Sequence, residues 1–244
     1  MIDGWQPVAR TRTYELVIDA VEDQILAGSL RVGDALPPER ELAAKLQVSR
    51  PAVREALRVL EAQGVLRSAA GSGAGAGTFV AAMPEAALSR FLRLHIALAN
   101  FEFAEIVEAR VALECSSVAL AAQASDPDRL VAVRAAMDRM IANETDREAF
   151  NDDDTALHTA IAEAGGNRLV TALTVAIRNA LRPKILDAFH EVEEWPALRT
   201  ELITEHAAIL AAIESGDAAT SSRLAEQHIR DSYDRLPLLH RSGT

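Results

Sequence analysis

The sequence predicts a mostly α-helical protein in which three helices and a two-stranded β-hairpin precede an all-α antiparallel helical bundle. Apolar residues recur at three- and four-residue steps along most of the 244 residues, as expected for amphipathic helices. The clearest interruption is the glycine-rich run 71–77, which lies between two short apolar segments typical of strands. After Pro84 the helical pattern resumes and continues almost to the C-terminus. These observations favour two domains of different architecture.

The N-terminal part is expected to contain five short elements. Proline and an early acidic residue suit the first turn of a helix, serine is a common N-cap, and glycine commonly ends a helix. In chain order the sequence predicts a helix from Tyr14 to Leu26 that stops before Gly28, a helix opening at Pro37-Pro38-Glu39, a helix capped by Ser49 and ended by Gly64, and strands at 65–67 and 78–80. This order is typical of a winged helix-turn-helix.

The rest of the chain is expected to form helices separated by capping residues. A proline inside one of them, Pro183, is expected to kink or split its helix. A capping box at Thr145-x-x-Glu148 and turns at Gly165-Gly166 and Gly216-Asp217 support the divisions. The predicted helices span 85–99, 101–124, 127–143, 146–164, 168–190, 196–214 and 217–235.

Composition places the chain among ordinary globular proteins, with 49% hydrophobic and 25% charged residues. No run of eighteen apolar residues is present, so no membrane association is expected. The N-terminus has neither the basic head nor the apolar core of a signal peptide, which predicts a cytoplasmic location. Cys115 is the single cysteine, which excludes an internal disulfide and a cysteine-rich zinc module. A metal ion would need histidine and carboxylate ligands.

Charge is distributed unevenly along the chain. The net charge of −11 disfavours contact with nucleic acid, because affinity for phosphates depends on lysine and arginine. The stretch 40–67 nevertheless has six basic residues and three acidic ones, a net charge of +3. A DNA-binding surface is therefore expected in this stretch.

The third predicted helix has the pattern of a recognition helix. Arg50, Arg54 and Arg58 recur every four residues and share one face, while the apolar residues turn inward. Arginine suits bidentate contact with guanine and contact with phosphate. Ser49 and Thr78 are small donors that can reach phosphate. The alternative is an ordinary solvated face on which the arginines pair with glutamates such as Glu39.

Four motifs of this part occur in a characteristic order. They are Gly33-Asp-Ala-Leu-Pro-Pro-Glu-Arg-Glu-Leu-Ala43, Val48-Ser-Arg-Pro-Ala-Val-Arg-Glu-Ala-Leu57, Leu60-Glu-Ala-Gln-Gly64 and Gly77-Thr-Phe-Val80. Together they resemble the DNA-binding domain of the GntR family of bacterial transcription regulators. The resemblance implies that Arg40, Arg50, Arg54 and the wing residue Gly77 contact operator DNA. The glycine-rich wing departs from the family pattern because it is longer and less basic.

Three histidines and one aspartate of the C-terminal part are spaced as a metal site requires. Asp154 and His158 are four residues apart and therefore share a helix face. His206 lies ten residues before Gly216 and His228 lies twelve after it, so two antiparallel helices would hold both at similar heights. Such a set suits zinc, nickel or manganese. The histidines can instead be exposed or core residues, and Asp152 or Asp153 is an alternative to Asp154.

The same residues lie in a series of motifs along the C-terminal part. The motifs are Glu108-Ala-Arg-Val-Ala-Leu-Glu114, Asp154-Thr-Ala-Leu-His158, Gly166-Asn167, Glu205-His206, Gly216-Asp217 and Gln227-His228. They resemble the FCD domain, the helical ligand-binding domain of the FadR subgroup. The resemblance implies a divalent metal held by Asp154, His158, His206 and His228, and a small carboxylate effector that faces Arg110. The alternative for Arg110 is an ion pair with Glu114 or Glu108.

Together these features predict a homodimeric DNA-binding transcription regulator, a repressor, whose affinity for a palindromic operator is controlled by a small organic acid. Residues 1–80 are expected to bind DNA, 81–84 to form a linker, and 85–240 to bind effector and dimerise. A metal-dependent hydrolase is the alternative from another class, but no nucleophilic triad or H-E-x-x-H motif supports an enzyme. A third hypothesis is a DNA-binding regulator whose helical bundle serves only for dimerisation.

Overall fold

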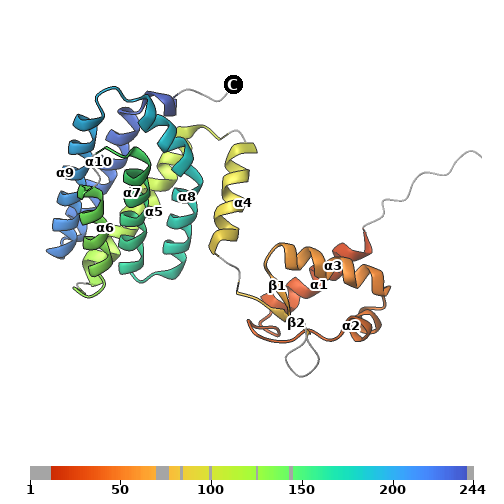
Figure 1. Ribbon diagram of the computed structural model, residues 1–244. Helices are drawn as coiled ribbons and strands as arrows, with labels where there is room; N and C mark the ends of the chain where they lie inside the picture. Colours follow the sequence, from red (N-terminus) through yellow and green to blue (C-terminus); the bar gives the residue numbers. More distant parts are fainter. Residues whose placement is uncertain are drawn as a thin grey trace, which may run out of the picture. The chain divides into compact units, whose positions relative to one another are not determined.

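The computed structural model describes residues 12–69, 77–82, 85–98, 101–124, 126–142 and 145–240. The chain divides into two compact units, residues 1–87 and 88–244 (Figure 1). Residues 71–76 of the glycine-rich loop and residues 83–84 of the expected linker lie outside the described residues. No helix among the described residues is long and apolar enough to cross a membrane.

The first unit is a winged helix-turn-helix, as the sequence predicts. Val53, Leu57 and Leu60 on one face of α3 are buried together with Val17 and Val21 of α1. This packing leaves the opposite face of α3 exposed. The elements are α1 Thr13–Leu26, α2 Glu39–Leu46, α3 Arg50–Ala62, β1 Leu66–Ala69 and β2 Gly77–Val80, with β1 and β2 antiparallel.

Local signals in the sequence set the limits of α3. The hydroxyl of Ser49 accepts a hydrogen bond from the backbone N–H of Ala52, which confirms the predicted N-cap. Gly64 follows the helix with φ of 79°, a left-handed conformation that glycine adopts without strain. An interaction that the sequence analysis missed joins Ala35 to Phe79 in an isolated β-bridge. This bridge ties the wing to the segment that leads into α2.

The second unit is a helical bundle built around α5 (Figure 1). Helix α5 packs against α7, α8, α9 and α10, so its side chains reach the centre of the bundle. The helices are α4 Glu85–Leu98, which begins in the first unit, α5 Phe103–Ala124, α6 Val131–Ala142, α7 Arg147–Ala164, α8 Arg168–Glu191, α9 Trp195–Glu214, α10 Ala218–Asp234 and a 3-10 helix, η1 Pro237–His240.

Two details of the sequence prediction are wrong. Helix α6 begins at Val131 rather than at 127, because the preceding residues form i,i+3 turns. The N-cap of α7 is Asp146, whose carboxylate accepts from two backbone N–H groups, and not Thr145. Of the two outcomes expected for Pro183, a kink or a split, the split does not occur, because α8 continues through this proline. Burial of Leu181 and Phe189 on either side of the proline offsets the lost backbone hydrogen bond.

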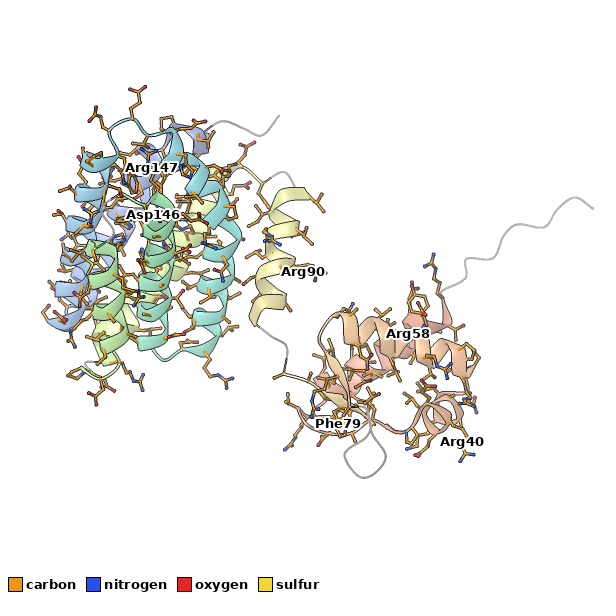
Figure 2. All side chains as sticks on the ribbon, viewed as in Figure 1. Arg40, Arg58, Phe79, Arg90, Asp146 and Arg147 are labelled. Atoms are coloured by element: carbon orange, nitrogen blue, oxygen red, sulfur yellow. The ribbon has the colours of Figure 1, made fainter. Side chains whose placement is uncertain are left out.

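Arginines cap the C-terminal ends of several bundle helices. Arg147, at the start of α7 beside Asp146 (Figure 2), donates to the carbonyl oxygens of Phe189 at 2.6 Å, His190 at 2.9 Å and Val192 at 3.0 Å. The carbonyls of Phe189 and His190 lie in the last turn of α8 and that of Val192 follows its end, where helical partners run out, although Phe189 also accepts from the backbone N–H of Val192 at 3.3 Å. The guanidinium also lies 5.3 Å from the centre of the Trp195 ring. One side chain therefore ties together α7, α8 and α9.

We predict that Arg147→Met lowers the free energy of unfolding by about 1–3 kcal/mol, because charge-assisted hydrogen bonds to partly buried carbonyls are lost. Arg223→Met is the matched control, since Arg223 is exposed on α10, and its effect should stay within about 0.5 kcal/mol. Urea denaturation of both variants measures the difference. Equal stability of the two would contradict a capping role for Arg147.

Candidate metal centre and DNA-binding surface

The exposed face of α3 carries the predicted arginines. Arg50, Arg54 and Arg58 are all exposed along this helix, and Arg40 is exposed on α2 (Figure 2). Ser49 is exposed at the N-terminus of α3, where backbone N–H groups favour an anion. The arrangement gives this unit a basic surface on its second and third helices.

One of these arginines is already paired. The guanidinium of Arg54 donates to the carboxylate of Glu39 on α2, with the shortest contact at 2.8 Å. The hydrogen bond from Arg54 lowers the pKa of Glu39. More than half of the Arg54 side chain is exposed, so the pair contributes little stability. The pair orients the guanidinium and leaves it accessible.

The wing contributes smaller groups to this unit. Gly77 is exposed at the start of β2 with φ of 149°, and Thr78 is half-buried. The predicted contact residues therefore lie on α2, α3 and β2, but most of the glycine-rich loop lies outside the described residues.

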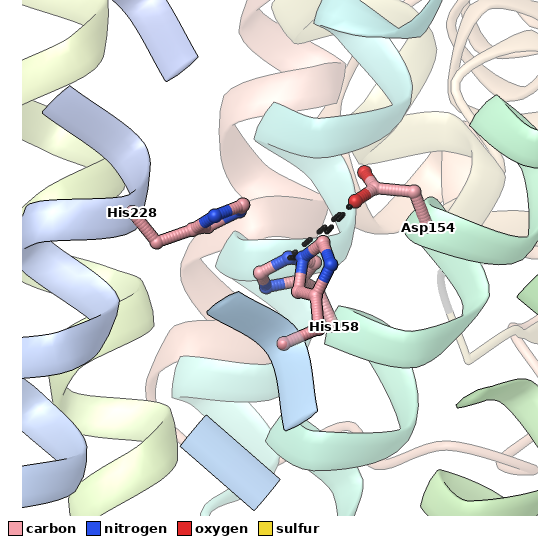
Figure 3. Close-up of side chains that lie close together, drawn as sticks. Asp154, His158 and His228 are labelled. Carbon is pink, nitrogen blue, oxygen red and sulfur yellow. Dashed lines mark hydrogen bonds and ion pairs between the residues drawn. The ribbon is translucent and has the colours of Figure 1, made fainter. Parts of the chain in front are cut away.

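In the second unit, the four residues predicted as metal ligands come together at the centre of the bundle. Asp154 and His158 extend from α7, His206 from α9 and His228 from α10. Each offers one ligand atom, and these atoms all lie within 4.8 Å of one another. Figure 3 shows His228 facing the α7 residues across the site. The structure places Asp152 and Asp153 outside this group, in ion pairs with Arg182 and Arg139 respectively.

The distances leave no room for a large group between these donors. His158 Nε2 lies 3.1 Å from His206 Nε2, and the latter lies 3.3 Å from an oxygen of Asp154. All four side chains are buried. A small cation held among them would exchange these contacts for metal–ligand bonds.

Two further carboxylates orient the histidines. Glu114 on α5 accepts from Nδ1 of His158 at 2.7 Å, and Glu205 on α9 accepts from Nδ1 of His228 at 2.7 Å. Each contact directs the opposite nitrogen, Nε2, away from the carboxylate and makes it available as a ligand. Nδ1 of His206 is buried without a hydrogen-bond partner in the described part of the chain.

Two buried arginines complete the centre. Arg110 donates to Glu114 at 2.9 Å, so the ion pair considered as the alternative role for Arg110 is present. Arg178 on α8, which the sequence analysis did not single out, donates to Glu114 at 2.6 Å and also to Asp154. Because Arg178 contacts one oxygen of Asp154 and the histidines approach the other, that second oxygen is available to a cation.

The environment sets the protonation states that a metal requires. Burial lowers the pKa of His158 and of His206, which favours neutral rings. Burial alone would raise the pKa of Asp154, but Arg178 and the three neighbouring histidines together outweigh burial and hold that pKa far below its ordinary value. Neutral imidazoles and an ionised carboxylate are the forms that bind divalent metals. The residues therefore fit a metal ion of the zinc, nickel or manganese type.

Comparison with known proteins gives independent evidence on the family. The FCD domain pattern matches residues 105–231, and the pattern "Bacterial regulatory proteins, gntR family" matches residues 13–76. The HTH-type transcriptional repressor NanR of Cronobacter sakazakii is 30% identical over 94% of this chain and 87% of that repressor. The chain belongs to the GntR family and carries an FCD domain.

Other similarities agree with this membership. NanR of Klebsiella aerogenes is 29% identical, over 92% of this chain and 85% of its own length. A solved structure of a GntR protein from Streptococcus agalactiae has the same fold, with a TM-score of 0.59 and 23% identity over 89% of this chain and 98% of that one. Membership in the GntR family confirms the predicted transcription regulator and the prediction that the protein is not an enzyme.

A small cavity adjoins the metal-ligand cluster of this GntR protein. It has a volume of about 30 Å³, enough for one or two water molecules. Arg110, Asp154, Arg178 and His228 line one part of it. Arg110 therefore lies at the wall of this cavity while it remains paired with Glu114.

We predict that the metal-free protein loses stability as the pH falls from about 7.5 to 5.5, the range in which histidines titrate. The pKa values of His158 and His206 are lowered in the folded state, so the unfolded chain takes up more protons below about 6.5 and is favoured. Urea denaturation in the presence of a chelator measures the slope.

The variant His206→Gln should reduce this slope, whereas His190→Gln, which alters an exposed histidine at the end of α8, should leave it unchanged. Comparing the two variants cancels the general effect of net charge on stability. If both variants have the same slope, folding does not lower the pKa values of the buried imidazoles.

Proposed function

We propose that this protein is a repressor whose operator affinity is controlled by a small carboxylate bound at a metal centre in the helical bundle. The observation that carries the proposal is the convergence of Asp154, His158, His206 and His228 beside a cavity that two arginines line. The two NanR relatives are named transcriptional repressors, which supports repression rather than activation.

In this proposal the four residues would hold one divalent ion, which would act as a Lewis acid toward the carboxylate of the effector. Arg110 and Arg178 at the cavity wall orient the rest of the carboxylate, because a guanidinium presents two parallel donors to two oxygens. Glu114 and Glu205 keep the ring nitrogens directed at the ion. The metal species is zinc, nickel or manganese.

The first unit reads the operator. Arg40, Arg50 and Arg54 contact DNA bases or phosphates, and Ser49, Gly77 and Thr78 contact the backbone. Two copies of the chain bind the two halves of a palindromic site, because half-site readers are commonly two-fold symmetric. Residues 1–80 form this DNA-binding domain, 81–84 the linker and 85–240 the effector-binding and dimerisation domain, and the protein works in the cytoplasm.

Control of the operator requires that the effector bind unequally to the DNA-competent and DNA-incompetent states. The contact that can differ is the one between Arg110 and Glu114, since an acid in the cavity competes with Glu114 for the same guanidinium. A regulator whose helical bundle serves only for dimerisation would have the same two folds, but no acid would change its operator affinity.

We predict that Arg50→Ala and Arg54→Ala each weaken operator binding by about 1–3 kcal/mol, because each removes a guanidinium from the exposed face of α3. Fluorescence anisotropy with a duplex selected by the wild-type protein from a random-sequence pool measures the loss. Arg168→Ala is the control, since it removes an exposed arginine from the bundle. If both α3 variants bind the operator with unchanged affinity, α3 is not part of the DNA interface.

We also predict that Glu205→Gln lowers the affinity for zinc about 10–100-fold, because His228 loses the carboxylate that orients it. Glu201→Gln is a closely matched control: Glu201 lies one turn earlier on α9 and pairs with the same Arg235, but it has no contact with His228 among the described contacts. Competition with a chromogenic chelator measures both affinities. Equal affinities, or no zinc bound by the wild type, would overturn the assigned metal centre.

A further inference from the structure

We propose that Glu39 positions Arg54 to read a guanine base in each half of the operator. The inference rests on the proposed function, because it names the base that one residue of the proposed DNA-binding surface recognises. It follows from the way in which the Glu39 carboxylate occupies one edge of the Arg54 guanidinium and leaves the other edge free.

The guanidinium of Arg54 has N–H donors on two edges, each able to donate two parallel hydrogen bonds. Its Nε lies 3.2 Å from Oε1 of Glu39, and its Nη2 lies 2.8 Å from Oε2, so Glu39 occupies the Nε edge. Nη1 makes no hydrogen bond with any residue that the structure describes. The edge formed by Nη1 and the second hydrogen of Nη2 is therefore free for a partner outside the chain.

This free edge belongs to an exposed side chain on a fixed support. The side chain of Arg54 is 52% exposed and that of Glu39 is 33% exposed. Their helices, α2 and α3, both pack on the core of the first unit, through residues such as Leu42 and Leu57. The pair therefore restrains a long side chain in one orientation, and an arginine restrained in advance loses less rotamer freedom when it binds a base.

The negative charge of Glu39 favours a base over a phosphate as the partner of Arg54. A phosphate on the free edge would lie close to the carboxylate on the other edge, and the two negative charges would repel each other. O6 and N7 of guanine are uncharged acceptors that match two parallel N–H groups of an arginine. Guanine is also the one base whose major-groove edge presents two acceptors side by side.

The other two arginines of this face have no such partner. The side chains of Arg50 and Arg58 pair with no carboxylate in the part of the chain that the structure describes. Glu39 neutralises only one of the three arginines, so the other two keep their attraction for phosphate. On α3 the unrestrained arginines therefore bind the DNA backbone, and the restrained one reads the sequence.

The test compares Glu39→Ala with Glu41→Ala in the full-length protein. Both substitutions remove one negative charge from the first turn of α2, but Glu41 pairs with Lys45 rather than with an arginine of α3. The wild-type protein first selects its preferred site from a random-sequence DNA pool. Competition fluorescence anisotropy then measures the affinity of each protein for that site with every base pair replaced in turn.

We expect the wild-type protein to prefer guanine at one position of each half-site by about 5–150-fold. Glu39→Ala should lower this preference at least about fivefold and leave the other positions unchanged, whereas Glu41→Ala should keep the whole pattern. A purely structural role of Glu39 would weaken the preference at every position alike. A loss confined to one base pair is therefore specific to a positioning role.

Variants of Arg54 test the same contact independently. Arg54→Lys alters only an exposed side chain and keeps its charge, but an ammonium group has no pair of parallel donors. It should therefore lose the guanine preference, even where Glu39→Ala does not fold. In the Arg54→Lys background, Glu39→Ala should cause no further loss at that position, because the two residues act as a unit.

The outcomes separate this inference from the proposed function. If Glu39→Ala and Glu41→Ala raise the affinity for all sequences alike, or if the preference survives Arg54→Lys, the guanine contact is overturned and the operator-binding role remains. If the wild-type protein selects no sequence from the pool, the inference and the operator-binding role fall together.

Discussion

The centre of the bundle depends on the buried carboxylate of Glu114. It accepts hydrogen bonds from Arg110, Arg178 and His158, which come from three different helices. A buried ion pair is costly to form, and removal of one partner leaves the others as uncompensated charges in a medium of low dielectric constant. Here two arginines and one imidazole share this partner, so α5, α7 and α8 are held in register by one side chain. Burial alone would raise the pKa of Glu114, but the two arginines and His158 together outweigh burial and hold that pKa well below its ordinary value.

The same network prepares the metal-ligand cluster. Arg178 links Glu114 to Asp154. It therefore orients the carboxylate of Asp154, which faces the histidines. Glu205 plays the corresponding part for His228 and is itself held by Arg235. His206 has no such support among the described residues, and its Nδ1 is buried without a partner. Three of the four candidate ligands are thus oriented by neighbouring charges before any cation binds, which reduces the reorganisation that binding would require.

The sequence predicts those parts that depend on local spacing. The arginine face of α3, its serine cap and the shared helix face of Asp154 and His158 all follow from a period of 3.6 residues. The approach of His206 to His228 follows from their similar distances to the turn at Gly216. Arg178 was missed because its role depends on Glu114, 64 residues earlier, and no local period joins them. A single arginine in an apolar helical stretch, Ala176-Ile-Arg-Asn-Ala-Leu181, was the signal available. Pro183 does not split α8, because packing of the helix in the bundle outweighs the local cost of the proline.

The position of Arg110 constrains how an acid can act on this protein. Its guanidinium is buried and paired with Glu114, so an acid that only replaced Glu114 would exchange one carboxylate for another and gain little. Glu114 would retain Arg178 and His158 as partners if Arg110 turned toward an acid. In the proposed function a divalent ion would add the positive charge that a second carboxylate needs, and the exchange would alter a contact on α5, which packs against four other helices of the bundle. A change at that contact would shift the surrounding helices, because a closely packed interior accommodates a displaced side chain by moving its neighbours.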